Sequence, residues 1–327
     1  MPANSSTPDS PLPRVVVARA LPAAGLELLR RRCTVEVGGI PLDAGWLATH
    51  VEGAAALVAD PTVAVAGELL DRAGPSLRVV ANFAVGVDNI DLEAVGARGV
   101  RATNTPDVLT NATAELAVGL MLAVGRRLVE TDRSLRNGAW TGWEPEQFLG
   151  RELSGATVGL VGFGRIGQRV AELLAGFGPR VVFAGRRPMA EDAGRLGAER
   201  VGLDELLGVC DYVSLHVSLN PSTRHLIDAA RLGQMKQGAV LVNTCRGGVV
   251  DTAALVDALR SGRLAGAGLD VYENEPAVPA ELVALSNTVL VPHIGSATRA
   301  TRDAMARLCA ENVLAVLAGR EPPTPVV

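Results

Sequence analysis

Cysteine is scarce in this sequence, with four residues in 327, and the four are dispersed. No two of them have the Cys-x-x-Cys spacing, and none has a Cys/His ligand spacing. This pattern predicts reduced thiols and no metal site. Most are expected to be small core residues, and they are Cys33, Cys210, Cys245 and Cys309.

Positive charge is not in excess either. The 31 Lys and Arg residues against 35 Asp and Glu give a formal net charge of −4, and no Lys/Arg cluster exceeds three residues. Proteins that bind nucleic acids usually carry a basic domain or stripe, so this balance argues against a nucleic-acid partner.

Long hydrophobic runs are also absent. The longest, LAVGLMLAVG over Leu116–Gly125, is well short of the roughly 20 residues that a membrane-spanning helix needs. The opening MPANSSTPDSPLP has no basic segment followed by an apolar core, so residues 1–13 are expected to be a disordered tail and not a signal peptide. A soluble cytoplasmic protein without a membrane partner is therefore expected.

Alternating short apolar runs and helical patterns fill the rest of the chain. Hydrophobic residues make up 48% of it, enough for two domains with their own cores. From about residue 14, β-branched runs such as RVVVARA alternate with helical stretches such as PAAGLELLRRR. This alternation is typical of βαβ units with a mostly parallel sheet. The first part of the chain thus predicts a flavodoxin-like domain.

A second alternation follows a long helical pattern from Asn111 to about Arg136. Its six predicted strands run from ATVGLVG to TVLVPH, and the last helical stretch has no strand after it, so that helix can pack back on the first domain. We therefore expect an α/β fold with two Rossmann-like domains. The substrate-binding domain is expected to be discontinuous, over residues 14–105 and 293–327, with an inserted dinucleotide-binding domain over 106–292.

The stretch VGLVGFGRIGQ has glycines at G-x-G-x-x-G spacing, between a predicted strand over Thr157–Val161 and a predicted helix over Arg165–Phe177. Gly162 allows the tight turn, Gly164 lets backbone approach a pyrophosphate, and Gly167 brings the helix against the strand. The helix N-terminus offers N–H groups to the phosphates. The motif therefore predicts dinucleotide binding, with a purely structural glycine turn as the alternative.

The next predicted strand lacks the acidic residue that NAD sites place about 20 residues after the glycines. VVFAG ends at Gly185, and Arg186 and Arg187 follow. No carboxylate repels a 2′-phosphate there, and two guanidinium groups suit one, so the stretch favours NADPH over NADH. Because Glu191 and Asp192 lie nearby, a solvated basic loop is the other interpretation.

Several motifs together resemble one family. VGFGRIG, LVNTCRGGVVD, GLDVYENEP and PHIGSAT occur in the order and spacing of the D-isomer-specific 2-hydroxyacid dehydrogenases, and NFAVGVDNID also matches. NGAWTGWEP and GRRP are most similar to the glyoxylate/hydroxypyruvate reductase branch. The resemblance implies an active site between two Rossmann-like domains. It also implies reduction of glyoxylate or hydroxypyruvate to the 2-hydroxy acid with NADPH, NADH being the alternative cofactor.

The resemblance implies three catalytic residues. Arg246 would grip the substrate carboxylate and polarise its carbonyl through two N–H bonds. His293 would be the acid/base, since the ordinary pKa of histidine lies near neutrality. Glu275 would pair with that histidine and favour its protonated form, with Glu273 as the competitor. The other histidines have no such motif and receive no chemical role: His50, His216 and His225.

Further contacts follow from the same resemblance. Backbone N–H groups of Val85 and Gly86 would hold the substrate carboxylate from the side opposite Arg246. Phosphite dehydrogenases carry a lysine at the Val85 position, so valine there argues for a 2-oxo acid. The cofactor contacts implied beyond the three glycines and two arginines are Arg165, Ile166, Thr223, Thr244, Cys245, Asp270 and Gly295.

Trp140 and Trp143 lie in a stretch that mediates dimerisation in this branch, so a homodimer is expected. Trp143 is the candidate to reach the partner subunit's substrate pocket, and an interface or core anchor is the other interpretation. Four other functions stay open: a broader 2-oxo acid reductase of the D-lactate type, a phosphite dehydrogenase, a short phosphoglycerate dehydrogenase, and a non-enzymatic corepressor that senses dinucleotides.

Overall fold

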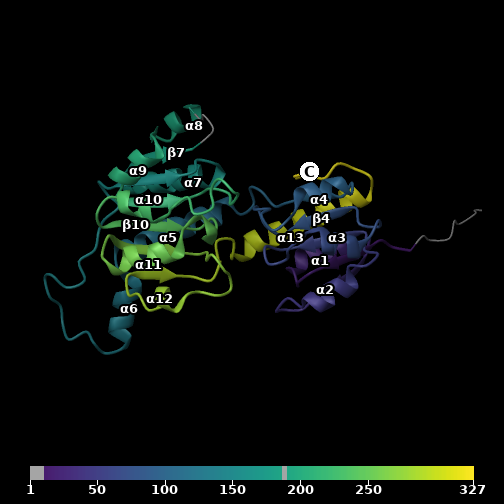
Figure 1. The fold of residues 1–327 in the computed structure, drawn as a ribbon, viewed down its shortest axis with the longest axis horizontal. Helices are drawn as coiled ribbons and strands as arrows, with labels where there is room; N and C mark the ends of the chain where they lie inside the picture. The colour runs from purple at the N-terminus through teal and green to yellow at the C-terminus, as the bar shows by residue number, and fades with distance from the viewer. Residues whose placement is uncertain (1–10, 186–189) are drawn as a thin grey trace, which may run out of the picture. The chain divides into compact units, whose positions relative to one another are not determined.

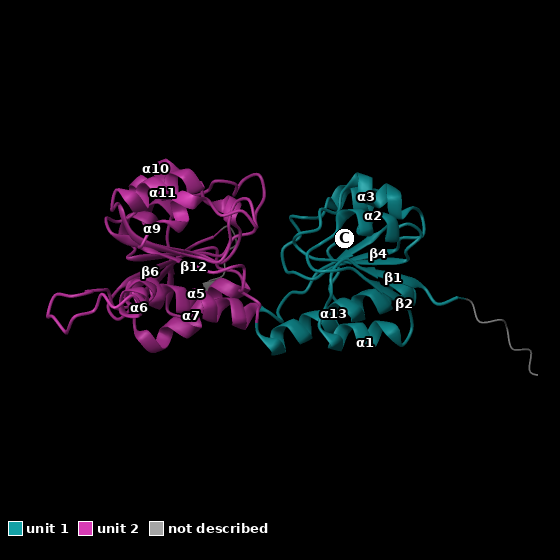
Figure 2. Ribbon diagram, turned by 90° about the horizontal axis from the view of Figure 1, so that it is seen from below, with its two compact units in different colours: residues 1–109, 298–327 teal, residues 110–297 magenta. Residues whose placement is uncertain are grey.

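The computed structural model describes residues 11–185 and 190–327, which fall into two units (Figure 1, Figure 2). One unit comprises Met1–Leu109 and Thr298–Val327, and the other comprises Thr110–Ala297. Both crossings lie slightly later in the chain than the predicted ones. They coincide with helix starts, because Thr110 begins one helix and Thr298 caps another. Most of the predicted N-terminal tail lies outside the described residues.

The first unit is built on a five-stranded parallel sheet with the order β2-β1-β3-β4-β5, which is the flavodoxin-like order. Every residue of β3 and β4 is buried, as expected for strands covered on both faces. The strands are β1 (Arg14–Val17), β2 (Thr34–Val37), β3 (Ala56–Ala59), β4 (Val79–Asn82) and β5 (Arg101–Thr103).

Helices cover both faces of this sheet, with α1 and α13 on one face and α2 and α3 on the other (Figure 2). An added Cβ at Gly25 in α1 would overlap the backbone of Ala306 in α13, so glycine permits the close approach of these two helices. The C-terminal helix therefore packs on the first unit, as its position in the sequence predicts. The helices are α1 (Ala23–Arg30), α2 (Ala44–His50), α3 (Gly67–Ala73), α4 (Leu92–Ala97) and α13 (Arg299–Leu317).

The second unit contains a seven-stranded parallel sheet with the order β12-β11-β10-β9-β6-β7-β8. From β6 the chain proceeds through β7 and β8 on one side and returns to β9 on the other. In open α/β sheets, ligands bind at the carboxyl edge near such a reversal. The six-strand prediction missed β8, a short edge strand. The strands are β6 (Thr157–Val161), β7 (Arg180–Ala184), β8 (Ala198–Arg200), β9 (Tyr212–Leu215), β10 (Ala239–Asn243), β11 (Leu264–Leu269) and β12 (Thr288–Leu290).

Two apolar cores flank this sheet. One lies between the sheet and α9, α10 and α11, and the other lies between the sheet and α5 and α7 (Figure 2). The α/β fold predicted from the sequence is confirmed in both units. The helices are α5 (Thr110–Gly125), α6 (Leu128–Arg136), α7 (Arg165–Leu174), α8 (Ala190–Arg195), α9 (Leu203–Val209), α10 (Ala229–Gln234), α11 (Thr252–Arg260) and α12 (Ala280–Val283), with 3₁₀ turns η1 (Ala175–Phe177) and η2 (Gly247–Val249).

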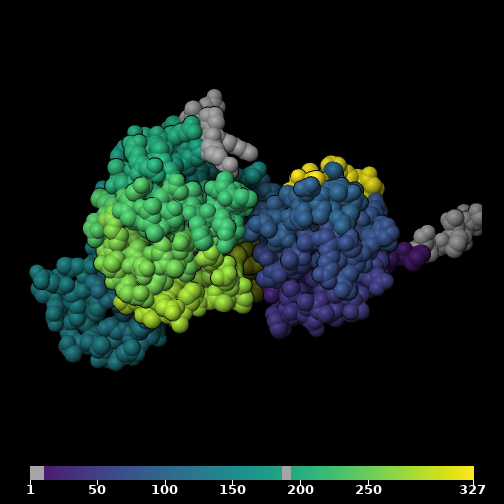
Figure 3. Space-filling view, viewed as in Figure 1, coloured from purple at the N-terminus to yellow at the C-terminus, as the bar shows by residue number. Residues whose placement is uncertain are grey.

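The long helix predicted from Asn111 to about Arg136 is in fact two helices. Arg127, with a φ of 53°, adopts a left-handed conformation that interrupts the helix between α5 and α6. An added Cβ at Gly125 would overlap the Tyr212 hydroxyl, and one at Gly150 would overlap the Gly125 carbonyl, so tight packing holds the break. No residue of α6 is buried, and this helix with the segment after it projects from the second unit (Figure 3).

The thiols of all four cysteines are free, three of them buried and that of Cys245 half-buried. Over residues 11–185 and 190–327, no cluster of three or more metal-binding side chains is found. Within the same ranges no helix is long and apolar enough to cross a bilayer.

Candidate active site

In the glycine-rich turn after β6, two of the three glycines lie directly against the backbone of another residue. Gly162 has a φ of 98°, and an added Cβ there would overlap the His216 carbonyl. An added Cβ at Gly167 would overlap the carbonyl of Gly162. Gly164, by contrast, faces open space and is the N-cap of α7, where no side chain caps the helix. The open face at the helix N-terminus is thus accessible to a phosphate group.

Two buried polar atoms at the same edge lack a hydrogen-bond partner in the protein. They are Nε2 of His216, directly after β9, and Oγ1 of Thr244, directly after the neighbouring strand β10. Burial lowers the pKa of His216 to about 4, so its ring is neutral near pH 7. Unpartnered buried polar atoms are costly unless a bound molecule satisfies them. Together with the open glycine, they fit a nicotinamide dinucleotide at this edge.

The end of β7 lies close to the glycine-rich turn. An added Cβ at Gly185 would lie 3.6 Å from the backbone nitrogen of Phe163, which is ordinary van der Waals contact. Arg186 and Arg187 lie outside the described residues. Arg200, at the end of β8, donates from Nη2 to the carbonyl oxygen of Gly185 over 2.8 Å. This arginine was missed from the sequence because its proximity depends on the pairing of β7 with β8.

His293 and Glu275 are directly hydrogen-bonded. Nδ1 of His293 lies 2.7 Å from Oε2 of Glu275, and the backbone N–H of Tyr272 donates to the other carboxylate oxygen over 2.9 Å. Burial alone would raise the pKa of Glu275. The hydrogen bond and charge of His293, the Tyr272 N–H and the charge of Arg246 outweigh burial and lower that pKa. The carboxylate is therefore ionised near neutral pH and accepts a hydrogen bond from the imidazole.

Asp270 holds the loop that carries His293. This aspartate is only 1% exposed, and its two oxygens accept the N–H groups of Ile294 (2.6 Å) and Gly295 (2.8 Å). The backbone N–H of His293 also donates to the Asp270 carbonyl over 2.9 Å. Burial raises the pKa of Asp270 despite these bonds and the charge of His293. The loops after β11 and β12 are consequently fastened together at the histidine.

Arg246 follows β10 in a turn that is fastened by Asn243. The Asn243 side chain donates to the Arg246 carbonyl over 2.9 Å and accepts the Cys245 N–H over 3.1 Å. Nη1 of Arg246 donates to the Cys245 carbonyl over 2.8 Å. Sequence reasoning did not single out Asn243, although it stands in the same NTCRGG motif. The turn thus presents the guanidinium at the edge that also carries Glu275 and His293.

Glu273, the competitor for the histidine, has other partners. Its Oε1 lies 2.6 Å from Nε2 of His225 and 3.3 Å from Nη2 of Arg224. The two neighbouring glutamates therefore bind two different histidines, and Glu275 is the one that faces His293.

The other predicted cofactor residues differ in their exposure and in their hydrogen bonds. Arg165 is exposed and Ile166 half-buried in the first turn of α7. The hydroxyl of Thr223 is used within its own loop, donating to the Ser218 carbonyl over 2.6 Å and accepting the Asn220 N–H over 2.9 Å. Its side chain thus caps a local turn.

Val85 and Gly86 lie in the first unit, in the loop after β4. The Val85 carbonyl accepts a hydrogen bond from the Asn104 side chain, and the Gly86 carbonyl accepts one from Asn82, each over 2.8 Å. Asn82 is fully buried and also bonded to Asn89. These amide groups, missed from the sequence, fix the orientation of the peptide groups in the loop.

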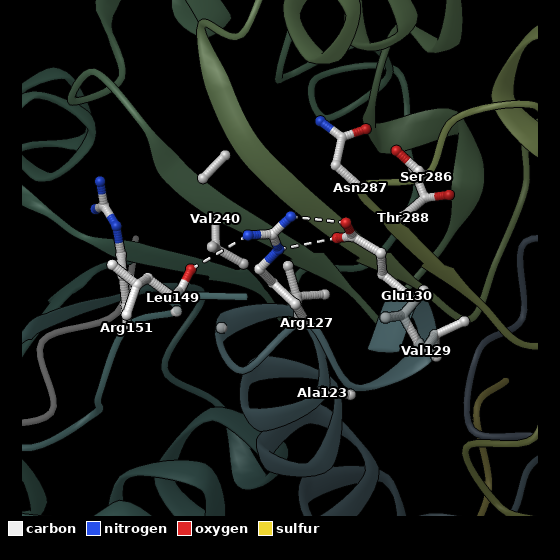
Figure 4. A pocket seen from close by; sticks show the side chains of 15 residues that line it. Ala123, Arg127, Val129, Glu130, Leu149, Arg151, Val240, Ser286, Asn287 and Thr288 are labelled. Carbon is white, nitrogen blue, oxygen red and sulfur yellow. Dashed lines mark hydrogen bonds and ion pairs between the residues drawn. The ribbon is translucent and has the colours of Figure 1, made fainter. Parts of the chain in front are cut away.

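Trp143 is 80% exposed and Trp140 is 49% exposed, both in the segment that projects after α6. A pocket beside α6 has a mixed polar and apolar lining and is crossed by the ion pair of Arg127 and Glu130, with bonds of 2.6 and 2.9 Å (Figure 4). Val240 and Thr288 line it near the starts of β10 and β12. The pocket is therefore at the amino edge of the sheet and contains none of the predicted site residues.

Comparison with known proteins decides the family. The model of the D-isomer specific 2-hydroxyacid dehydrogenase NAD-binding domain matches residues 118–295. The chain belongs to this family. It is an NAD(P)-dependent D-2-hydroxyacid dehydrogenase, which confirms the family, the two-domain Rossmann-like fold and the nicotinamide dinucleotide cofactor predicted from the sequence.

Relatives of this dehydrogenase include the glyoxylate reductase of Thermococcus onnurineus, 48% identical over 318 residues, with 95% of each chain covered. A solved NADPH-dependent glyoxylate/hydroxypyruvate reductase from Sinorhizobium meliloti, in complex with NADP and malonate, is 37% identical with a TM-score of 0.86. That match covers 96% of this chain and 97% of the other. A glyoxylate reductase structure from Paecilomyes thermophila is 32% identical with a TM-score of 0.85, covering 97% and 99%.

Proposed function

We propose that this dehydrogenase reduces glyoxylate, and hydroxypyruvate as a related substrate, to the corresponding 2-hydroxy acid with NADPH as the preferred donor. The hydrogen bond between His293 and Glu275, at the sheet edge that carries Arg246 and the glycine-rich turn, is the observation that carries the proposal. The names of the similar reductases support the choice of substrate.

Arg246 binds the carboxylate of the 2-oxo acid and polarises its carbonyl group through directed N–H bonds. A bound dinucleotide supplies the hydride that the oxo carbon accepts. His293, whose Nδ1 is engaged by Glu275, gives the proton on Nε2 to the carbonyl oxygen. Glu275 stays ionised because its pKa is lowered, and so it stabilises the protonated imidazole before the transfer. Substrate, NADPH and one proton thus yield the hydroxy acid and NADP⁺.

The residues that would hold the dinucleotide are the three glycines of the turn, with Gly164 nearest the pyrophosphate. Thr244 would offer its unpartnered hydroxyl to the cofactor. We assign the further contacts as predicted to Arg165, Ile166, Thr223, Cys245, Asp270 and Gly295.

The preference for NADPH rests on the end of β7. Gly185 offers no carboxylate, Arg186 and Arg187 follow it, and Arg200 adds a guanidinium that is bonded to the Gly185 carbonyl. Guanidinium groups favour the 2′-phosphate, which NADH lacks.

For the substrate carboxylate we assign additional N–H donors at Val85 and Gly86. Support comes from the side-chain amides of Asn104 and Asn82, which hold the carbonyls of this loop. We further propose a homodimer. The exposed indole of Trp143 would either reach the partner subunit's substrate pocket or anchor the interface.

A matrix of initial rates tests this function. NADPH and NADH are each measured with glyoxylate, hydroxypyruvate and pyruvate, and NADP⁺ and NAD⁺ are measured with phosphite. We expect the highest kcat/KM for glyoxylate or hydroxypyruvate with NADPH. A faster reaction with pyruvate would favour a D-lactate type enzyme, and phosphite oxidation would favour a phosphite dehydrogenase. Binding of NADPH without turnover of any 2-oxo acid would contradict the proposal.

A further inference from the structure

The loop after β11 carries the carboxylates of two histidine–carboxylate pairs, and the proposed reaction uses only one of these pairs. His293 pairs with Glu275, while His225 pairs with Glu273 at 2.6 Å. The Glu273 side chain is the more buried of the two glutamates, 17% exposed against 34%. Burial alone would raise the pKa of Glu273, but the hydrogen bonds from His225 and Thr252 outweigh it and lower that pKa. The ionised carboxylate of Glu273 therefore lies beside the proposed active site without a role in the reaction, and its contacts indicate what it does there.

His225 is fastened to the turn that follows Arg246. Its backbone N–H donates to the carbonyl of Gly248 over 2.8 Å, and the N–H of Ile227 donates to the carbonyl of Val249 over 3.0 Å. His225 has a φ of 48°, a left-handed conformation that is unfavourable for a residue with a side chain. Such strain persists where surrounding contacts impose it. These hydrogen bonds therefore fix His225 to η2, the turn directly after Arg246.

The same turn packs on the backbone next to Glu273. An added Cβ at Gly247 would overlap the carbonyl of Tyr272 and the backbone nitrogen of Glu273, so no side chain fits there. The N–H of Tyr272 in turn donates to Glu275 over 2.9 Å. One continuous contact thus links Arg246, through Gly247 and Tyr272, to the carboxylate that binds His293.

We propose that His225 and Glu273 are positioning residues that hold the turn carrying Arg246 against the loop carrying Glu275. This inference rests on the proposed function, because it concerns the spacing between the carboxylate anchor and the acid/base pair. The packing at Gly247 is van der Waals contact, and the hydrogen bond from His225 to the Glu273 carboxylate ties the same two loops a second time. Nη2 of Arg224 donates a further hydrogen bond to the same oxygen of Glu273.

The test compares His225→Leu with His225→Gln. Leucine removes the donor to Glu273, while the glutamine amide keeps an N–H. In His225→Leu we expect the KM for glyoxylate and the Kd of oxamate, an unreactive analogue, to rise about tenfold. The kcat should change by less than about threefold, since the carboxylate grip acts in ground and transition states alike. NADPH affinity should stay within about twofold of wild type, and His225→Gln should restore most of the oxamate affinity.

Lys236→Gln is the matched control, because it removes an ion pair of 2.7 Å with Asp211 at the opposite edge of the same sheet. It should leave the KM and oxamate affinity unchanged. If the His225 pair were merely structural, its loss would lower the melting temperature and the active fraction without a change in KM. That result, or unchanged oxamate affinity in His225→Leu, overturns the proposal. Should His225→Leu not fold, Glu273→Gln, which keeps an acceptor oxygen but removes the charge, must weaken oxamate binding for the proposal to stand.

Failure of the proposed function has a different signature. Wild-type protein that reduces no 2-oxo acid contradicts that function. Oxamate binding to the NADPH complex would still report on whether the His225 pair sets the spacing of Arg246.

Discussion

Nδ1 of His293 and Oε2 of Glu275 are 2.7 Å apart, while Glu273, two positions earlier in the chain, turns to His225. Each of the two neighbouring glutamates thus binds its own histidine at the carboxyl edge of the sheet. The bond to Glu275 commits Nδ1 of His293 to the carboxylate, and in the proposed reaction Nε2 is then the nitrogen for proton transfer.

Glu275→Gln should lower kcat for glyoxylate reduction by about 10- to 100-fold, because the imidazole loses the anion that stabilises its protonated form. The KM for glyoxylate should change much less, because the substrate carboxylate is assigned to Arg246. Steady-state rates, compared with those of the exposed control Glu281→Gln, measure both effects. An unchanged kcat would argue against a role of the pairing in the catalytic step.

Stability should depend on pH through the same glutamate. The pKa of Glu275 is lowered on folding, so its ionised form contributes stability above its unfolded pKa of about 4.3, and this contribution is lost as the pH falls through the lower folded value. Wild type should therefore have a higher Tm than Glu275→Gln at neutral pH, and the gap should close below about pH 4. A gap that widens in acid would have the wrong sign.

Arg246→Lys should raise the KM for glyoxylate steeply and reduce kcat/KM by about 100-fold or more, since an ammonium group keeps the charge but loses the planar fork. NADPH binding, followed by fluorescence, should be nearly unchanged. Arg263→Lys, directly before β11, provides a control far from the carboxyl edge of the sheet. A kcat/KM equal to that of wild type would remove Arg246 from the site.

Thr244→Val should have opposite effects on the free protein and on cofactor binding. Removing an unpartnered buried hydroxyl should leave the Tm of the free protein unchanged or raise it. The same change should weaken NADPH binding by about 3- to 30-fold if the hydroxyl bonds the cofactor. Thermal unfolding with and without NADPH compares the two directly. A lower Tm of the free protein would indicate that the hydroxyl has a partner within the fold.

Gly185→Asp should shift the preference from NADPH toward NADH by about tenfold or more, because it places a carboxylate where the 2′-phosphate is expected. The glycine has space for a Cβ at ordinary contact distance, so the Tm should change little. Arg186→Ala and Arg200→Gln should weaken NADPH binding and leave NADH binding unaffected. Equal affinity ratios in wild type and both arginine variants would make the GRRP stretch a solvated basic loop.

Local motifs are where sequence reasoning succeeded. The strand, glycine turn and helix at Gly162, Gly164 and Gly167 follow one another directly, and Gly167 packs on the carbonyl of Gly162 within the same turn. The alternation of short apolar runs with helical patterns likewise predicted six of the seven strands of the second sheet and the return of α13 to the first unit. These features depend on neighbours along the chain, so the order of residues carries them.

Other features depended on tertiary structure. Whether Glu273 or Glu275 meets His293 is decided by how the loops after β9, β11 and β12 lie side by side, and Arg200 reaches Gly185 only because β8 pairs with β7. The break at Arg127 likewise follows from the packing of Gly125 against Tyr212 and Gly150, which periodicity does not report. The sequence by itself determined which chemical groups stand at the strand ends. The sheet order then decided which of them meet, since hydrogen bonds form between neighbours in space.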